Sequence, residues 1–188
     1  MRIIAGDFRG RALAAVGKGD ASAHLRPTSD RVRESLFNVL SSGSYGDPIT
    51  GARVLDLFAG TGALGLESLS RGAKHVSFVD DGNKALTLLR QNVSLCRAEA
   101  ITKIFRSDAR RLVANRDDPY DLIFLDPPYG KSLGEQAITT VLKNGWIADD
   151  ALIIWEENAA IEVPVQFEIF DQRKYGETRI SILGKIKV

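Results

Sequence analysis

The chain has 188 residues, enough for one domain or for one domain with a small extension. Hydrophobic residues make up 44% and charged residues 26%, the composition of an ordinary soluble globular protein. The single cysteine, Cys96, excludes an internal disulfide, and no apolar stretch is long enough to span a membrane. The two histidines lie apart from any cluster at metal-ligand spacing. We therefore expect a cytoplasmic protein without a metal ion.

Positive charge is concentrated in the first 40 residues, although the formal net charge of the chain is only +1. This segment holds seven Lys and Arg against four acids, a net charge of +3. The remaining residues hold eighteen basic and twenty acidic side chains, a net charge of −2. A basic arm on a near-neutral body suits a polyanion that contacts one end of the molecule. A merely solvated N-terminal segment is the plainer alternative.

The N-terminal region predicts a short β-rich arm, Met1–Leu13, and a helix, Asp30–Leu40. Helical spacing places the apolar side chains of this helix on one face, which can pack on a core. Arg31 points away from that face and Arg33 lies on its flank. We therefore expect the helix to present both arginines outward.

Four near-continuous apolar runs predict strands of a parallel sheet that is covered on both faces. These runs are Arg53–Leu57, His75–Val79, Leu122–Leu125 and Leu152–Trp155. Helical patterns lie between them, at Ala63–Arg71, Asn83–Cys96 and Leu133–Leu142. A weaker strand is expected at Ile101–Phe105 and a short helix at Ala109–Ala114. The alternation of strand and helix predicts a doubly wound α/β sheet.

The C-terminal part differs, because its apolar residues alternate more strongly with polar ones. Two such segments, Val165–Phe170 and Arg179–Ile186, are joined by a short connection around Tyr175 and Gly176. Alternation with a short connection is typical of antiparallel strands. We expect this pair to close one edge of the sheet.

A tight glycine turn follows the first predicted strand of the sheet. Gly60, Gly62 and Gly65 match the spacing of the dinucleotide-binding fingerprint. Glycines suit this turn because its backbone angles are closed to residues with a Cβ, and because a ligand approaches the main chain closely. Together with Phe58 and Ala59 they form the predicted cofactor-binding turn. Nicotinamide enzymes share this spacing, so the glycines alone leave the cofactor open.

Acids after three successive strands favour S-adenosylmethionine over a dinucleotide. Asp56 precedes the glycine turn, where a carboxylate repels a pyrophosphate but attracts a cationic amino group. Asp80 ends the next strand, where an acid can accept hydrogen bonds from ribose hydroxyls, and the strand pattern favours it over Asp81. Asp108, followed by Ala109, lies where a carboxylate can meet the adenine amino group. Each acid alone also suits an ordinary polar strand end.

The segment Asp126-Pro127-Pro128-Tyr129 ends a further apolar strand, and ligands of open α/β sheets bind at such carboxyl ends. An exocyclic base amine is a poor nucleophile, because its lone pair is delocalised into the ring. The Asp126 carboxylate and the Pro127 carbonyl can accept its two N–H groups and aim the lone pair at a methyl group. Tyr129 offers a flat face for an unpaired base. The plainer alternative is a proline-terminated strand with Tyr129 capping the core.

With these motifs assembled, the chain resembles the bacterial 16S ribosomal RNA guanine-N2 methyltransferases of the small, single-domain type over almost its full length. The matching segments are Arg2–Gly6, Arg9–Arg11, Arg26–Asn38, Leu55–Gly62, Asp126–Tyr129 and Tyr175–Thr178. The segment RPTSDRVRESLFN is the specific part, since the glycine turn is generic to methyltransferases. The family usually has Glu where Asp80 stands, which changes the reach of the acid more than its role.

The resemblance implies a Rossmann-like class I methyltransferase fold with seven strands, mostly parallel, and an antiparallel C-terminal hairpin strand. Residues 1–50 would form a small β-arm and helix that bind RNA, and residues 51–188 the methyltransferase domain. The implied reaction is methylation of one guanine N2 amine of 16S ribosomal RNA in an assembling 30S particle. We expect a monomer that holds RNA with five arginines, namely Arg9, Arg11, Arg26, Arg31 and Arg33.

Three other functions remain in competition. A DNA adenine-N6 or cytosine-N4 methyltransferase would use the same Asp-Pro-Pro-Tyr turn, but it usually needs a target-recognition insertion for which this chain has little room. An RNA-binding assembly factor without catalysis would not need Asp56, Gly60, Gly62 and Asp126 intact. A nicotinamide dehydrogenase would leave the Asp-Pro-Pro-Tyr turn without a role.

Overall fold

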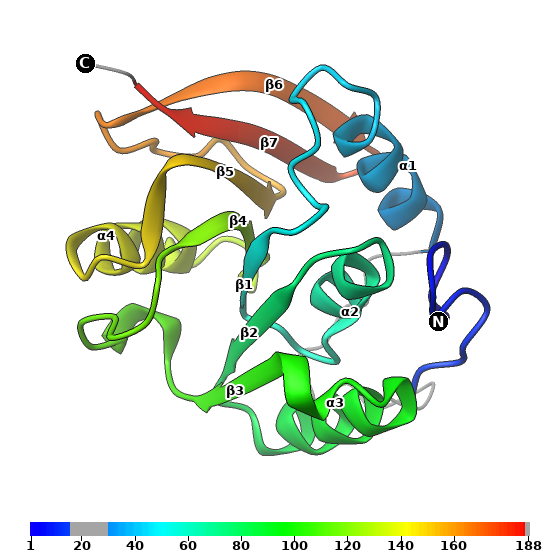
Figure 1. Cartoon of the computed structure of the whole chain (residues 1–188). Coiled ribbons are helices and arrows are strands. Elements are labelled where there is room, and N and C mark those ends of the chain that lie inside the picture. Colours follow the sequence, from blue (N-terminus) through cyan, green and yellow to red (C-terminus); the bar gives the residue numbers. More distant parts are fainter. Residues whose placement is uncertain (16–29, 187–188) are drawn as a thin grey trace.

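The computed structural model describes residues 1–15 and 30–186 (Figure 1). Its strands are β1 Arg53–Leu57, β2 His75–Asp80, β3 Thr102–Arg106, β4 Tyr120–Leu125, β5 Ile147–Glu157, β6 Phe167–Tyr175 and β7 Thr178–Lys185. Its α-helices are α1 Asp30–Leu40, α2 Ala63–Ser70, α3 Asn83–Cys96 and α4 Leu133–Lys143. The described residues also form two short 3₁₀ helices, η2 Glu99–Ile101 and η3 Ala109–Arg111.

All seven strands form one sheet in the order β3-β2-β1-β4-β5-β7-β6. Strands β1 to β5 pair in parallel, whereas β7 runs antiparallel between β5 and β6. The expected fold, a doubly wound and mostly parallel sheet with an antiparallel C-terminal hairpin, is confirmed. The order reverses between β1 and β4, and open α/β sheets bind ligands beside such a switch point.

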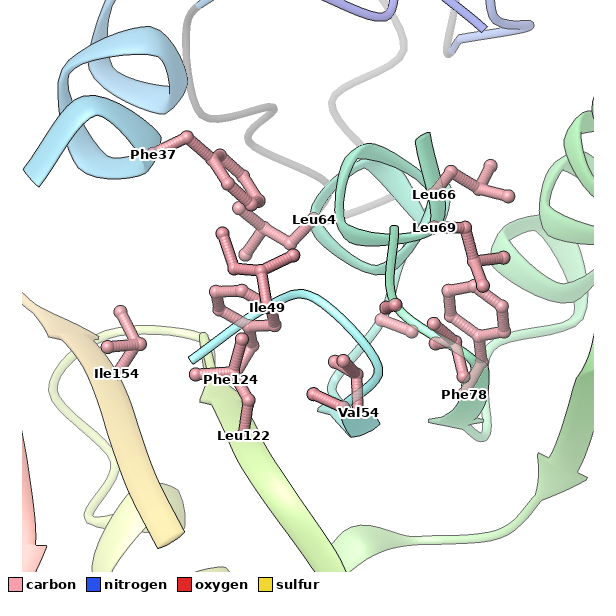
Figure 2. Close-up of a cluster of buried hydrophobic side chains, with 14 of the residues drawn as sticks. Phe37, Ile49, Val54, Leu64, Leu66, Leu69, Phe78, Leu122, Phe124 and Ile154 are labelled. Atoms are coloured by element: carbon pink, nitrogen blue, oxygen red, sulfur yellow. The ribbon is translucent and has the colours of Figure 1, made fainter. Parts of the chain in front are cut away.

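Successive side chains of the central strands face opposite sides of the sheet, which explains their near-continuous apolar sequences. One set packs under α1, α2 and α3, and the other packs under α4 and η3. In Figure 1, α2 and α3 lie on one side of the sheet and α4 on the other. Figure 2 shows Phe37 of α1, Leu64 of α2 and Phe124 of β4 in the first of these two cores.

Helix α1 has the predicted bounds, but one of its arginines lies on the opposite side from the one expected. Arg33 is 0% exposed, and its Nη2 donates to Asp30 Oδ1 at 2.6 Å and to the Arg2 carbonyl at 2.8 Å. The reason is helical spacing, because position 33 falls on the same stripe as the buried Leu36, Phe37 and Leu40. The expectation that Arg33 faces outward was wrong.

The N-terminal arm is a small antiparallel loop with a single bridge between Arg2 and Ala12, less regular than the expected β-arm. A buried carboxylate of α2, Glu67, fastens it to the sheet domain. Glu67 accepts hydrogen bonds from the Ile4 N–H at 2.8 Å and the Ala5 N–H at 3.1 Å. Arg71 of α2 donates to the same carboxylate at 2.7 Å.

The predicted helices and strands differ from the observed ones mainly at their ends. Strand β5 is eleven residues long and includes two terminal glutamates that were not assigned to it. The helix expected at residues 109–114 is one turn of 3₁₀ helix, η3. None of the helices in the described part of the chain is long and apolar enough to cross a membrane.

Removing the Glu67 carboxylate should destabilise the fold by detaching the arm. Glu67→Ala leaves two backbone N–H groups and the Arg71 guanidinium without their acceptor, and breaking such a buried pair costs about 3–5 kcal/mol. Urea unfolding measures this loss. The exposed Glu168 on β6 is the matched control, for which Glu168→Ala should change stability by less than about 0.5 kcal/mol. Equal effects of the two substitutions would contradict the anchoring role.

Candidate active site

Two predicted functional turns meet at the carboxyl ends of β1 and β4. Leu57 of β1 lies opposite Leu125 of β4, so the glycine turn (residues 58–62) and the Asp-Pro-Pro-Tyr turn (residues 126–129) leave the sheet side by side. The Asp126 N–H donates to the Leu57 carbonyl at 3.5 Å. On the other side, the Ala59 N–H donates to the Val79 carbonyl at 3.0 Å. The glycine turn therefore lies between the ends of β2 and β4.

The glycine turn leaves β1 through three residues with positive φ. Phe58 has φ 60°, Gly60 φ 55° and Gly62 φ 79°. Glycine adopts this region without strain, but Phe58 does not, and such strained residues cluster at functional sites. The backbone thus turns sharply away from the strand, as expected for a cofactor-binding turn.

Packing within the protein already requires a glycine at position 65, and positive φ together with packing requires one at position 62. A Cβ at Gly65 would lie 2.4 Å from the Phe78 ring of β2. A Cβ at Gly62 would lie 2.4 Å from a methyl group of Leu89 on α3. These glycines allow α2 to pack closely on β2 and α3. Their fingerprint spacing therefore carries less information about the cofactor than the acids do.

Asp56 is 2% exposed, and its Oδ2 accepts the Gly65 N–H of α2 at 3.0 Å. The carboxylate thus braces the first turn of α2, a contact that the sequence did not predict. Burial raises the pKa of Asp56 to about 8, and the nearby Asp80 carboxylate acts in the same direction. A cation placed beside this acid would favour its ionised form. Asp56 therefore suits the ammonium group expected from the donor.

Asp80 ends β2 and turns its carboxylate toward the glycine turn. Its Oδ2 accepts the Gly60 N–H and its Oδ1 accepts the Gly82 N–H, each at 2.8 Å. Burial raises the pKa of Asp80, and the two backbone hydrogen bonds oppose that shift. Asp81 is exposed. Asp80 faces the glycine turn, and each of its carboxylate oxygens retains a second lone pair for a ribose hydroxyl. The geometry therefore favours Asp80 over Asp81 as the acid that meets a ribose.

Asp108 lies after β3 as expected, but its carboxylate is held by a neighbouring arginine. Arg110 Nε and Nη2 donate to its two oxygens at 2.9 Å and 2.6 Å, and this contact lowers the pKa of Asp108. Ala109 beside it is buried. A contact between Asp108 and an adenine amino group stays a prediction. The amino group would have to share the Asp108 carboxylate with Arg110.

The Asp-Pro-Pro-Tyr turn presents Pro127 buried and Pro128 exposed. The Tyr129 hydroxyl donates to Glu156 Oε1 at 2.6 Å and lies 3.1 Å from Thr178 Oγ1. Sequence reasoning missed both partners. Glu156 could have been found, because it lies in the last two residues of β5, at the same edge of the sheet as Asp80 at the end of β2 and Asp126 after β4.

The predicted RNA-binding arginines have different surroundings. Arg9 and Arg31 are exposed, whereas Arg11 is half-buried and its Nη1 donates to the Leu95 carbonyl at 2.7 Å. Arg33 is buried, as described above, and Arg26 lies outside the described residues. The geometry therefore leaves Arg9 and Arg31 best placed to contact a polyanion.

No group of three or more His, Cys, Asp or Glu within residues 1–15 and 30–186 could hold a metal ion. His75 lies at the opposite end of β2 from Asp80, and its Nε2 is 3.1 Å from Ser77 Oγ. Cys96 is buried, as expected for a thiol of the core.

Comparison with known proteins identifies the family. The family model described as "Conserved hypothetical protein 95" matches residues 1–184. Ribosomal RNA small subunit methyltransferase D of Escherichia coli (strain K12) is 37% identical over 180 residues, which cover 94% of this chain and 86% of the relative. The chain belongs to that methyltransferase family. The protein of the same name from Haemophilus influenzae is 41% identical over 159 residues, covering 83% and 78% of the two chains.

Solved structures agree with this family. The structure of "Putative methyltransferase yhhF" from Escherichia coli superposes with a TM-score of 0.83 at 35% identity, covering 98% of this chain and 97% of the other. The methyl donor of such class I methyltransferases is S-adenosylmethionine. The strained glycine turn with Asp56 and Asp80 beside it fits this cationic nucleoside. The glycine spacing therefore marks a site for S-adenosylmethionine and not for a dinucleotide.

The raised pKa of Asp56 predicts a specific dependence of stability on pH. An Asp titrates near 3.9 in an unfolded chain and near 8 here, so the folded state binds an extra proton between these values. Stability should therefore fall as pH rises from about 4 to about 8. Asp56→Asn removes this loss. As pH rises, the free energy of unfolding of the mutant should increase relative to that of the parent by up to about 1.4 kcal/mol per pH unit.

Urea unfolding without donor at pH 5 and pH 8 measures the difference between mutant and parent. Taking this difference cancels the titration of the groups that do not interact with Asp56, and Asn can still accept the Gly65 N–H. A difference that is the same at both pH values would show that Asp56 has an ordinary pKa.

Proposed function

We propose that the protein transfers a methyl group from S-adenosylmethionine to the exocyclic N2 amine of a guanine in 16S ribosomal RNA. The observation that carries this proposal is the junction of β1 and β4, where Asp126 is hydrogen bonded to the strand that leads into the donor turn. A base amine held by Asp126 would lie beside the donor. The relatives named ribosomal RNA small subunit methyltransferase D support ribosomal RNA as the substrate.

The reaction depends mainly on positioning. When bound, S-adenosylmethionine supplies an electrophilic methyl group on a positively charged sulfur. The Asp126 carboxylate and the Pro127 carbonyl accept the two amine N–H groups, which aims the nitrogen lone pair along the line of attack. As the new N–C bond forms, the sulfur–methyl bond would break and leave a neutral thioether, and the amine becomes cationic and more acidic. Asp126 stabilises that charge and can receive the departing proton.

The two prolines make this arrangement rigid. Each fixes its own φ and lacks an N–H donor, so the turn offers carbonyl acceptors without competing donors. Pro127 is buried against the protein, which holds its backbone in place. Tyr129 follows at the end of the turn and provides a stacking face for the extruded base.

The choice of guanine and of a 30S particle rests on the resemblance of the N-terminal segments. The exposed Arg9 and Arg31 lie on the arm and on α1, and they are suited to contact phosphates. Assembly of ribosomal particles takes place in the cytoplasm, so the proposed substrate implies that location. We propose that the protein acts as a monomer, which sedimentation of the purified chain can test.

Labelled methyl transfer to three matched substrates tests the function. The substrates are unmodified 30S particles, naked 16S ribosomal RNA and DNA. We expect label in ribosomal RNA, and digestion to nucleosides should recover it as N2-methylguanosine. Label in DNA, or recovery as a methylated adenine or cytosine, would overturn the proposal. Particle binding without any transfer would indicate a non-catalytic assembly factor.

Asp126→Ala should abolish transfer while sparing the donor site. Loss of one positioned transition-state contact costs about 10²–10³-fold in rate. Calorimetry should give a dissociation constant for S-adenosylmethionine within about twofold of the parent. Asp118→Ala, an exposed position before β4, is the control and should behave as the parent does. Full activity of Asp126→Ala would refute the assigned role.

Arg31→Glu should weaken RNA binding through charge alone. Removing one phosphate contact makes the negative slope of log affinity against log salt shallower by about 1. The added acid lowers the affinity further. Filter binding of 16S ribosomal RNA over a salt series measures this slope. Lys143→Glu, at the end of α4 under the opposite face of the sheet, is the control. A salt slope unchanged by Arg31→Glu would count against α1 as an RNA contact.

A further inference from the structure

Two buried glutamates end β5, and both bind the segment that follows the two prolines. Glu156 is 7% exposed and Glu157 is 6% exposed. Glu156 accepts the Tyr129 hydroxyl at 2.6 Å, and Glu157 Oε1 accepts the Gly130 N–H at 3.3 Å. Burying a carboxylate is costly unless it is hydrogen bonded. Glu157 Oε1 also accepts the Asn158 N–H at 2.9 Å, so residues 129 and 130 supply part of the donors that these buried acids need.

Thr178 adds a second contact to the same hydroxyl from another strand. It begins β7, and its Oγ1 lies 3.1 Å from the Tyr129 oxygen. The hydroxyl is thus held between the ends of β5 and β7, which are themselves paired in the sheet. Burial and the contact with Glu156 raise the pKa of Tyr129, so the hydroxyl remains a donor at neutral pH.

The position of this hydroxyl determines where the ring lies. The oxygen is at the far end of the side chain, so fixing it fixes χ1 and the direction of the ring. A ring that is free to change rotamer would offer a stacking face in several directions, and only one of them can support a base amine at Asp126. A misplacement of about 1 Å in such a site can reduce the rate by about 10²-fold.

We propose that Glu156 and Thr178 are positioning residues, which hold Tyr129 in the orientation that the target base requires. This inference rests on the proposed function, because it assumes that a base stacks on Tyr129. Neither residue needs to touch the base or the donor. Their action passes through the tyrosine hydroxyl, and that dependence can be measured.

The test compares three variants with the parent on unmodified 30S particles. Thr178→Val keeps the shape of the side chain but removes its hydroxyl, and Thr178→Ser keeps the hydroxyl. Tyr129→Phe keeps the stacking ring but loses both hydrogen bonds. Thr87→Val, at an exposed position on α3, is the matched control for the loss of a threonine hydroxyl.

We expect Thr178→Val to lower kcat about tenfold with an unchanged donor dissociation constant, since one of two anchoring contacts remains. Thr178→Ser should restore most of kcat, and Thr87→Val should have no effect. Tyr129→Phe should lower kcat by at least as much as Thr178→Val. Adding Thr178→Val to Tyr129→Phe should lower it no further, because Thr178 acts only through the missing hydroxyl.

Three outcomes would overturn the inference. One is an unchanged kcat for Thr178→Val, even if its melting temperature falls, because the contact would then be merely structural. Another is a multiplicative loss in the double variant, which would mean that Thr178 acts independently of Tyr129. A parent protein that methylates no substrate would overturn the proposed function and this inference with it.

Discussion

Burying a carboxylate is unfavourable unless hydrogen-bond donors surround it, and this constraint organises the whole carboxyl edge of the sheet. Strands β1, β2 and β5 each carry a buried or half-buried acid in their last two residues, and each acid binds a backbone N–H group of a neighbouring turn or helix. Asp56 binds the first turn of α2, Asp80 binds the glycine turn, and Glu157 binds Gly130. The acids therefore hold in place the turns on which the proposed chemistry depends.

The same constraint determines which charge of ligand the buried acids favour. Burial raises the pKa of both Asp56 and Asp80, and the Asp80 carboxylate raises the pKa of Asp56 further. A cationic donor would favour the ionised form of both acids, so its binding would offset part of the unfavourable free energy of burying them. A site with this arrangement should favour a cation and disfavour a pyrophosphate, independently of the glycine spacing.

Much of the fold could be predicted because its signals are local. The bounds of β1, α1 and α3 follow from apolar runs and helical spacing, and these agree with the structure. Strand β5 was predicted too short, because its polar ends lack an apolar pattern while the pairing with β4 and β7 extends it. Pairing with a distant strand is not visible in a short window of sequence.

The sequence predicted where the residues of the candidate site lie, but it did not predict several of their side-chain partners. Asp80, Asp126 and Tyr129 were placed at the correct edge because parallel strands bring their carboxyl ends together. The partner of Asp108 and the partners of Tyr129 depend on side-chain directions that the sequence pattern does not encode. Arg33 was misassigned for a different reason, since its buried position was already present in the helical spacing but was outweighed by its charge.

The hairpin of β6 and β7 connects the N-terminal extension with the Asp-Pro-Pro-Tyr turn. Tyr175, at the end of β6, accepts a hydrogen bond from Ser35 of α1 at 2.9 Å. Across the hairpin, Tyr175 pairs with Thr178, whose hydroxyl lies beside Tyr129. The N-terminal extension and Tyr129 are thus fastened to the two sides of one tight turn. In the proposed function, an RNA bound along α1 would meet a tyrosine whose position is fixed relative to that helix, so the proposed phosphate contacts and the proposed base contact would keep a fixed spacing.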